Sequence, residues 1–226
     1  MTIVTAPGQL APSADVHGSA QIGARSRVWD LAQIRADARI GADCVIGRGA
    51  YVGVGVRIGD KVKIQNYALV YEPAVIADGV FIGPAAAFTN DLYPRAVTPT
   101  GAAKTASDWT PQGVVVGEGA SIGARAVCVA PITIGRWAMV AAGAVVTTNV
   151  PDFALMVGVP ARRVGWVGRA GVPLVPDQVI PDVAAVSAER FDGAGLAGGE
   201  SVERWRCPAT GAIYHCDAEQ LREERA

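Results

Sequence analysis

Apolar positions recur every sixth residue along most of the chain. One frame contains Val16, Ile22, Val28, Ile34, Ile40, Ile46, Val52, Ile58, Ile64, Val70, Ile76, Ile82 and Phe88. A second run restarts out of phase and contains Val116, Ile122, Cys128, Ile134, Val140 and Val146. Half of all residues are apolar, so chance would give nineteen successive hits roughly once in half a million trials. The period of six is therefore a structural repeat.

The position two residues before each of these is also restricted, and it is most often alanine. Both positions must face an interior. A period of six excludes an amphipathic helix, whose apolar residues recur at about 3.6. Glycine often follows the repeated position, as in Ile22-Gly23 and Ile122-Gly123, and we attribute it to the bends that glycine tolerates. The pattern predicts short strands separated by bends, three to a coil, which is an all-β, parallel β-helix.

The repeat divides the chain into three parts. We expect a β-helix domain over residues 12–166, a linker rich in Gly, Ala, Pro and Val over 167–200, and a short C-terminal extension over 201–226. The extension should contain two short strands around a turn at Thr210-Gly211. Nineteen hexapeptides give about six coils, which stack to roughly 30 Å at ~4.8 Å per layer. The flat sides of such a prism favour a homo-oligomer.

A long insertion interrupts the repeat, because 28 residues separate Phe88 from Val116. Residues 89–113 contain polar, proline and aromatic residues. Long excursions from a rigid scaffold are commonly functional. The alternative is a solvated loop that the solenoid merely tolerates.

Residues eighteen apart should lie on successive coils, about 4.8 Å from each other. Glu72 and Asn90 form one such pair, and Tyr71 and Thr89 form the neighbouring pair. A carboxylate and an amide on one outer face can together accept the N–H hydrogens of an amine. The alternative is a surface hydrogen bond without chemical consequence.

Small side chains form a second set of such pairs, which joins Gly123 to Ala141 and Ala124 to Ala142. A narrow ligand arm can approach the backbone there. We expect nearby cations suited to phosphate, at Arg125, Arg136, Arg162 and Arg163. The alternative is that the small residues pack against a neighbouring subunit.

Composition narrows the possible partners. The net charge is −1, which gives no field to attract nucleic acid or an anionic membrane. The first residues lack the features of a signal peptide, and no apolar stretch is long enough to span a bilayer, so we expect a cytoplasmic protein. Cys44 and Cys128 fall on interior positions, whereas Cys207 and Cys216 have a spacing that only weakly suggests zinc. His17 and His215 are the two histidines of the chain, and His17 lies four coils, about 19 Å, from Asn90, so no metal is expected.

Several segments together resemble one family. They are KIQNYALVYE (63–72), FIGPAAAFTNDLYPRA (81–96), ASIGARAVCVAPITIG (120–135), AMVAAGAVVTTNVPDFALMVGVPARRVGW (138–166) and CPATGAIY (207–214). They resemble the hexapeptide-repeat nucleotide-sugar N-acetyltransferases, especially those that act on UDP-2-acetamido-3-amino-2,3-dideoxyglucuronate. The resemblance implies a left-handed β-helix, acetyl-CoA as co-substrate, and a homotrimer with its sites between subunits.

The resemblance also implies roles for individual residues. Asn90 and Glu72 are the expected catalytic residues, which would orient the amine while the departing CoA thiolate takes its proton. Substrate-binding residues are expected at Arg35, Asn66, Tyr71, Tyr93 and Arg95, and cofactor-binding residues at Ala124, Ala141, Ala142, Arg162 and Arg163. Asp30 stands where related enzymes often carry histidine. Two other functions stay open: a dTDP-3-amino-3,6-dideoxyhexose N-acyltransferase, and a non-catalytic trimeric scaffold.

Overall fold

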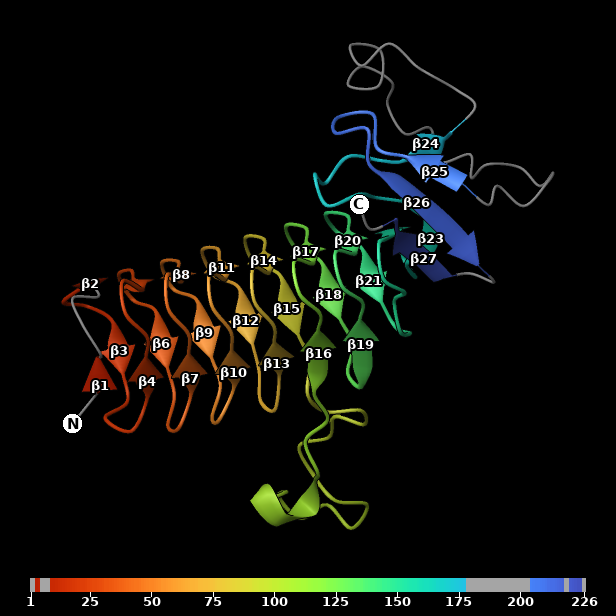
Figure 1. Ribbon diagram of the computed structural model, residues 1–226. Helices are drawn as coiled ribbons and strands as arrows, with labels where there is room; N and C mark the ends of the chain where they lie inside the picture. Colours follow the sequence, from red (N-terminus) through yellow and green to blue (C-terminus); the bar gives the residue numbers. More distant parts are fainter. Residues whose placement is uncertain (1–2, 5–8, 178–203, 218–219, 225–226) are drawn as a thin grey trace.

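The computed structural model describes residues 3–4, 9–177, 204–217 and 220–224. Most of the chain forms a three-sided prism of short parallel strands that wind around one axis (Figure 1). Sheet A contains β1 (Ile3–Val4), β4 (Gln21–Ile22), β7 (Arg39–Ile40), β10 (Arg57–Ile58), β13 (Val75–Ile76), β16 (Val114–Val116) and β19 (Ile132–Ile134). The prism is the predicted parallel β-helix, and its arrangement agrees with the left-handed form that the resemblance implies.

The other two sides of the prism are sheets B and C. Sheet B contains β2 (Gln9–Leu10), β5 (Arg27–Val28), β8 (Val45–Ile46), β11 (Lys63–Ile64), β14 (Phe81–Ile82), β17 (Ser121–Ile122), β20 (Met139–Val140), β22 (Ala154–Val157) and β23 (Arg162–Trp166). Sheet C contains β3 (Asp15–Val16), β6 (Gln33–Ile34), β9 (Tyr51–Val52), β12 (Leu69–Val70), β15 (Ala87–Phe88), β18 (Val127–Cys128) and β21 (Val145–Val146). Among the described strands of sheets A, B and C, only β23 runs antiparallel to its neighbour, β22.

The repeated apolar residues form the core of the prism. Neighbouring strands pair with an offset of eighteen residues, as in Val28 with Ile46. Ile46, Ile64 and Ile82 are completely buried, so the predicted inward position is confirmed. Cys128 is buried on the same side of the repeat, and burial raises the pKa of its thiol to about 12.

Three corners join the sheets, and we name each after the sheets that it connects. The A–B corner leads from sheet A to sheet B, and the B–C and C–A corners follow in the same sense. Most corners bend through a left-handed residue three positions after the buried strand residue, such as Arg25, with a φ of 60°, or Gly49, with a φ of 63°.

The glycine that directly follows the strand has a different role from the one predicted. Gly83 does not have a positive φ. A Cβ atom at Gly83 would instead lie 2.6 Å from the backbone nitrogen of Ala124 in the next coil. The close approach of two coils, rather than tolerance of a bend, therefore requires glycine at this position.

The β-helix begins two strands earlier than predicted. β1 pairs with β4, and β2 pairs with β5, in the same eighteen-residue register as the later strands. Val4 and Leu10 continue the frame of Val16 towards the N-terminus. The predicted boundary at residue 12 therefore falls within the coiled structure.

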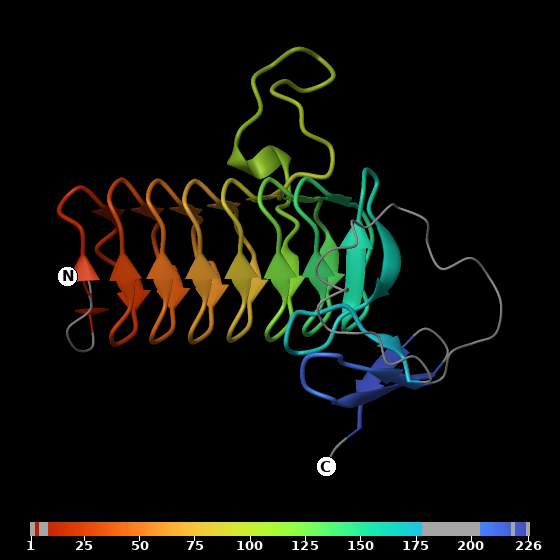
Figure 2. The ribbon, with the colours of Figure 1, turned by 90° about the horizontal axis from the view of Figure 1, so that it is seen from above.

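The insertion leaves the prism at the C–A corner. β15 ends at Phe88, β16 begins at Val114, and the loop between them contains a short 3-10 helix, η1 (Ala106–Asp108). The backbone N–H of Gln112 donates to the carbonyl of Asn90 at 2.9 Å, which closes the loop at its root. Figure 2 shows the loop projecting from the side of the prism as a separate excursion.

The C-terminal extension covers the end of the prism. A small antiparallel sheet consists of β24 (Val175–Pro176), β25 (Arg204–Arg206), β26 (Ile213–Asp217) and β27 (Gln220–Glu223). β25 and β26 flank Gly211, as predicted. The ring of Tyr214 contacts that of Phe153 at the A–B corner, with centroids 5.4 Å apart. In Figures 1 and 2 this sheet and the inserted loop lie on opposite sides of the prism.

The first part of the predicted linker is packed structure. Val167 is completely buried, Leu174 is 6% exposed, and the backbone N–H of Leu174 donates to the carbonyl of Trp166 at 2.9 Å. Residues 178–200 of the predicted linker lie outside the described residues. Apolar residues of the extension join the core cluster of the prism, so this end is covered by the chain itself.

Candidate functional site

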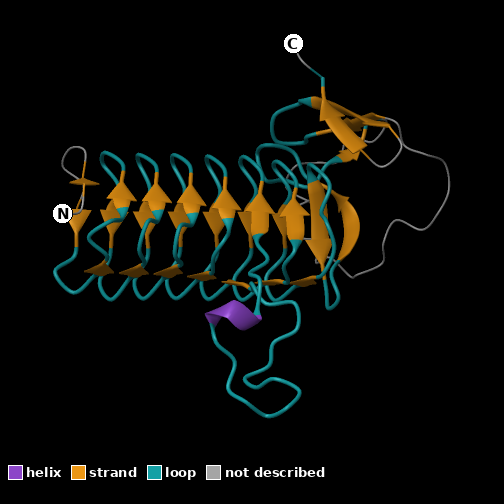
Figure 3. Ribbon diagram, turned by 90° about the horizontal axis from the view of Figure 1, so that it is seen from below, coloured by secondary structure: helices purple, strands orange, loops and turns teal. Residues whose placement is uncertain are grey.

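The C–A corner brings Glu72 and Asn90 onto successive coils. β12 and β15 pair Leu69 with Ala87 and Val70 with Phe88, and the same register continues into the turn. Glu72 and Asn90 therefore lie one above the other, as the eighteen-residue spacing predicts. The inserted loop begins at the next residue, and Figure 3 shows it leaving this corner.

Two tyrosines and an arginine accompany Glu72. The rings of Tyr51 and Tyr71 are in contact, with centroids 4.9 Å apart and planes tilted by 44°. Burial raises the pKa of Tyr51, the negative charge of Glu72 raises it further, and Arg35 opposes the shift. Three of the predicted site residues, Arg35, Tyr71 and Glu72, therefore share one surface with Tyr51, which sequence reasoning missed.

The Glu72 carboxylate leans towards the preceding coil. Its Oε2 atom occupies the space that a Cβ atom at Gly53 would need. Oε2 is buried and has no hydrogen-bond partner. Within the described part of the chain, the Asn90 amide also makes no hydrogen bond. The two side chains share a corner, but in this structure Glu72 points away from Asn90.

The remaining predicted substrate residues are dispersed. Tyr93 lies in the inserted loop and is 78% exposed. Arg95 follows in the same loop, where its Nη1 donates to the carbonyl of Pro94 at 3.1 Å. Asn66 lies at the B–C corner, where its Oδ1 accepts from the backbone N–H of Arg48 at 2.9 Å. The structure therefore separates Asn66 from the group around Glu72.

The predicted cofactor residues gather at the B–C corner. β17 and β20 pair Ile122 with Val140, which aligns Ala124 with Ala142. The turn after β22 continues this column, because the N–H of Ala161 donates to the carbonyl of Val145 at 2.8 Å. Arg162 begins the next strand and is exposed. The small residues and the arginine-bearing turn thus form one surface.

The other predicted cations are placed differently. Arg163 lies over the ring of Trp166, 4.3 Å from its centroid. Arg136 is at the A–B corner, away from the small residues, and its Nη2 lies 2.8 Å from Oδ2 of Asp152. The expectation that Arg136 serves the small-residue surface is therefore wrong, because its guanidinium pairs with this carboxylate.

Sheet C separates the two groups of candidate residues. The C–A corner bounds it on one side and the B–C corner on the other, so a single chain holds Glu72 and Ala124 at different corners. From β9 to β21, the outward residues of sheet C form a continuous apolar column of half-buried side chains: Tyr51, Leu69, Ala87, Val127 and Val145.

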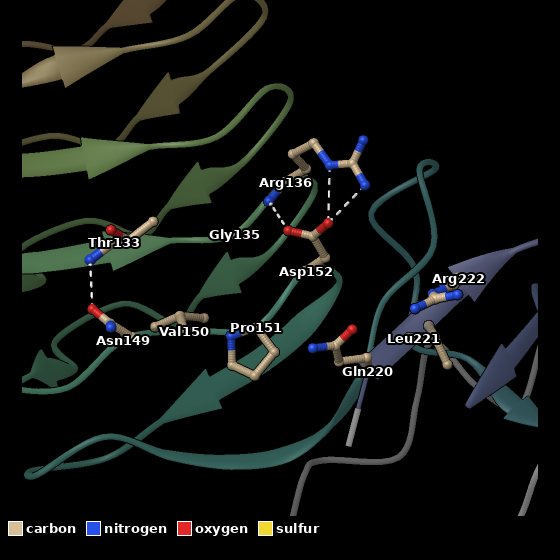
Figure 4. Close-up of a pocket in the computed structure, with 10 residues that line it drawn as sticks. All are labelled: Thr133, Gly135, Arg136, Asn149, Val150, Pro151, Asp152, Gln220, Leu221 and Arg222. Carbon is tan, nitrogen blue, oxygen red and sulfur yellow. Dashed lines mark hydrogen bonds and ion pairs between the residues drawn. The ribbon is translucent and has the colours of Figure 1, made fainter. Parts of the chain in front are cut away.

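A cavity of about 670 Å³ lies elsewhere, between the last coil and the small sheet (Figure 4). Thr133, Arg136 and Asp152 line it from the prism, and Gln220 and Arg222 line it from β27. Sequence reasoning missed this cavity because nothing in the repeat indicates where the extension docks. The cavity contains none of the predicted catalytic or cofactor residues.

The described residues contain no cluster of three or more His, Cys, Asp or Glu side chains arranged to hold a metal ion. Cys207 is completely buried, and Cys216 is partly exposed. Among the described elements, no helix has the length and apolar character needed to cross a bilayer.

Comparison with protein families supports the repeat. Residues 14–53 match the model described as bacterial transferase hexapeptide (six repeats), and residues 113–148 match the hexapeptide repeat of succinyl-transferase. A UDP-N-acetylglucosamine acyltransferase from Bacteroides fragilis has a similar structure, with a TM-score of 0.58 and 14% identity. This likeness covers 71% of the present chain and 62% of that chain, and it concerns the fold.

Two curated relatives are acetyltransferases. A dTDP-3-amino-3,6-dideoxy-α-D-galactopyranose 3-N-acetyltransferase from Aneurinibacillus thermoaerophilus is 57% identical over 53 residues, which are 24% of this chain and 28% of the relative. Serine acetyltransferase from Salmonella typhimurium is 39% identical over 103 residues, 45% of this chain and 37% of the relative. The matches thus span about a third of each relative. The described chain forms a β-helix of hexapeptide repeats, and the curated proteins named here that match parts of it are acetyltransferases, one of which acts on a nucleotide sugar.

Proposed function

We propose that the protein transfers the acetyl group of acetyl-CoA to the amine of a nucleotide-linked amino sugar. The observation that carries this proposal is the C–A corner, where Glu72 and Asn90 lie on successive coils beside the inserted loop. Among the residues that the structure describes, neither side chain has a hydrogen-bond partner there, and both offer oxygen acceptors suited to an amine. The 57% identity with a nucleotide-sugar N-acetyltransferase supports the same chemistry.

The proposed acceptor is a UDP-3-amino-glucuronate, after the family that the sequence motifs resemble. The exposed guanidinium of Arg35 beside the tyrosine pair is compatible with a sugar that carries a carboxylate. A second candidate is a dTDP-3-amino-3,6-dideoxyhexose. The similarity to the relative from Aneurinibacillus thermoaerophilus, whose name specifies such a sugar, supports this candidate. The two acceptors differ in nucleotide and in the group at the sugar C6.

The chain's own residues act by positioning the amine. Asn90 and Glu72 accept its N–H hydrogens and aim the nitrogen lone pair at the thioester carbonyl. The new C–N bond forms as the C–S bond breaks, and the proton lost from nitrogen goes to the departing thiolate. The small residues around Ala124 and Ala142 let the ligand approach the backbone, whose N–H groups stabilise the developing oxyanion. Arg162 holds phosphate at the same corner.

A complete site requires a second copy of the chain in this proposal. Glu72 and Ala124 lie at different corners of one prism, with sheet C between them. Packing of the apolar sheet C column against another copy would bring the C–A corner of one subunit to the B–C corner of its neighbour. A closed ring of three such contacts is the proposed homotrimer.

Thiol release measured with each sugar nucleotide tests the proposal. The protein is incubated with acetyl-CoA and either the UDP-3-amino-glucuronate or the dTDP-3-amino-3,6-dideoxyhexose. We expect sugar-dependent release of free CoA, at least tenfold faster with the UDP sugar. A preference for the dTDP sugar would instead assign the second candidate.

A non-catalytic scaffold predicts a different result. It would show no transfer with either sugar, and its melting temperature would not rise with acetyl-CoA. A protein that binds acetyl-CoA in the folded state is stabilised by about 2.7 kcal/mol at a hundredfold excess over the dissociation constant. Absence of both transfer and stabilisation would refute the proposed function.

A further inference from the structure

Polar side chains at one position of the turn form a regular ladder at the A–B corner. This position lies two residues after the buried strand residue. Oδ1 of Asp60 accepts from the backbone N–H of Ala42 at 2.7 Å, and Oδ1 of Asp78 accepts from the N–H of Asp60 at 2.8 Å. Each carboxylate lies over the glycine of the preceding coil, Gly41 or Gly59.

The same arrangement recurs at the B–C corner. Oδ1 of Asn66 lies over Gly47 and accepts from the N–H of Arg48 at 2.9 Å. At these positions the short side chain therefore satisfies a backbone N–H of the coil before it. These bonds are structural, because they join neighbouring coils and leave the oxygen occupied.

Glu72 occupies the equivalent position at the C–A corner and breaks the ladder. Its carboxylate lies over Gly53, as the others lie over their glycines. Its Oε2 atom nevertheless has no hydrogen-bond partner, so the N–H of Val54 does not bind it. Glutamate is one methylene longer than aspartate, and this carboxylate rests in the place of a ladder residue without making the ladder bond.

An unsatisfied buried oxygen makes the resting position easy to leave. A carboxylate held by a backbone N–H must lose that bond to move, whereas Glu72 loses none. Asn90 lies on the opposite side of Glu72, in the following coil, and its amide is also without a partner in the described residues. Glu72 as a whole is half-buried, so part of its side chain is exposed to solvent although Oε2 is not.

We propose that Glu72 is a movable carboxylate, which rests over Gly53 in the empty protein and turns towards Asn90 when the acceptor amine binds. This inference rests on the proposed function for its ligand. The length of the side chain at position 72 determines whether its carboxylate binds a backbone N–H of the ladder or reaches the amine. Aspartate at this position would be held by the N–H of Val54, as Asp60 and Asp78 are held, and would not reach the amine.

The test compares Glu72→Asp with the reverse exchange Asp78→Glu, which lies at a corner outside the site. Glu72→Asp keeps the charge, and we expect its kcat/KM for the amino sugar to fall by about tenfold to hundredfold because the carboxylate is displaced. Its KM for acetyl-CoA should not change, and its melting temperature should equal or exceed that of the wild type. Asp78→Glu should lower the melting temperature slightly and leave both kinetic constants unchanged.

Each arm has a result that overturns the inference. Wild-type kcat/KM in Glu72→Asp would show that the reach of the side chain is not needed. A melting temperature below the wild type would show that Glu72 already stabilises the turn and that aspartate does not enter the ladder. The thermal measurement needs no substrate, so it tests the resting position of Glu72 independently of activity. Failure of the wild type to acetylate either sugar would refute the proposed function, but it would leave this thermal test valid.

Discussion

The A–B and C–A corners use the same repeat in opposite ways. At the A–B corner, Asp60 and Asp78 tie each coil to the one before it through backbone N–H groups. At the C–A corner, Glu72 and Asn90 stand in the equivalent place without such bonds, and a long loop replaces the turn. The repeat needs only two inward residues per hexapeptide to build its core, so the turn residues at one corner are free for other chemistry.

The comparison also explains where the chain places its two additions. The C-terminal sheet packs at the A–B corner through Phe153 and Tyr214. The inserted loop departs from the C–A corner after Asn90. Sheet C, which carries the apolar column, is bounded by the C–A and B–C corners and is not covered by the contact at the A–B corner. The regular corner thus supports the fold, and the irregular corner carries the candidate site.

The largest expected effect follows from converting the irregular corner into a regular one. Phe88 and Val116 are 28 residues apart, which is 22 more than one repeat. Deletion of residues 91–112 therefore restores the period of six, and the loop ends already meet at the Asn90–Gln112 hydrogen bond. We expect acetyl transfer to fall by more than a hundredfold while the β-helix remains folded, measured by thiol release and circular dichroism.

A second deletion provides the control for register. Removal of residues 91–113 leaves the turn one residue short, and a slip of one residue turns the inward side chains of β16 outward. This variant should be much less stable than the in-frame deletion. Equal stability of the two deletions would contradict the register that places Asn90 above Glu72, and full activity of the in-frame deletion would remove the loop from the site.

Replacement of Asn90 by Ala should have the next largest effect. The amide makes no hydrogen bond in the described structure, so its loss should barely change stability. We expect turnover to fall by more than tenfold, because loss of orientation at a reacting nitrogen is worth several kcal/mol. Initial rates at saturating acetyl-CoA measure the effect.

Asn149→Ala is the matched control for that variant. Asn149 holds the backbone N–H of Thr133 at 2.8 Å, so this amide is structural. Its removal should lower the melting temperature and leave turnover unchanged. The opposite pattern, lost turnover in Asn149→Ala and lost stability in Asn90→Ala, would exchange the structural and functional roles assigned to the two asparagines.

Sequence reasoning reached the fold because the repeat imposes it locally. Each hexapeptide carries its own inward residues, and the register of Val70 with Phe88 follows from the spacing alone. The same reasoning aligned Glu72 with Asn90, but it could not give the direction of a side chain within the turn. It also missed Tyr51, because an outward residue of a strand carries no periodic signal that distinguishes contact with a neighbour from exposure to solvent.

The docking of the C-terminal extension could not be predicted from the sequence for a different reason. Tyr214 and Leu221 are buried against the prism, yet they lie outside the repeat and their contacts are long-range. No spacing rule relates them to Phe153 or Trp166. The cavity lined by Arg136 and Arg222 depends on this docking, so no pattern in the sequence indicated it.

Gly59→Ala should destabilise the regular corner without affecting the site. A Cβ atom at Gly59 would lie 2.8 Å from the backbone nitrogen of Asp78 and would overlap its carboxylate. Because backbone must shift, we expect the free energy of unfolding to fall by about 1–3 kcal/mol. Urea unfolding measures this loss. Reduced turnover of the folded variant would contradict the separation of the two corners.

The smallest effect is expected from the ion pair at the A–B corner. Nε and Nη2 of Arg25 donate to the two carboxylate oxygens of Asp43 at 2.6 and 2.5 Å, and this contact lowers the pKa of Asp43. A lowered pKa in the folded state adds stability that is present above the ordinary aspartate value of 3.8 and is lost as the pH falls through the folded value. Asp43→Asn should therefore lower the melting temperature slightly at pH 7, and the difference from the wild type should vanish at low pH.

Both groups are exposed, so added salt should also reduce the difference in melting temperature. A difference that grew on acidification would show that Asp43 stabilises the corner in its neutral form rather than as the charged partner of Arg25.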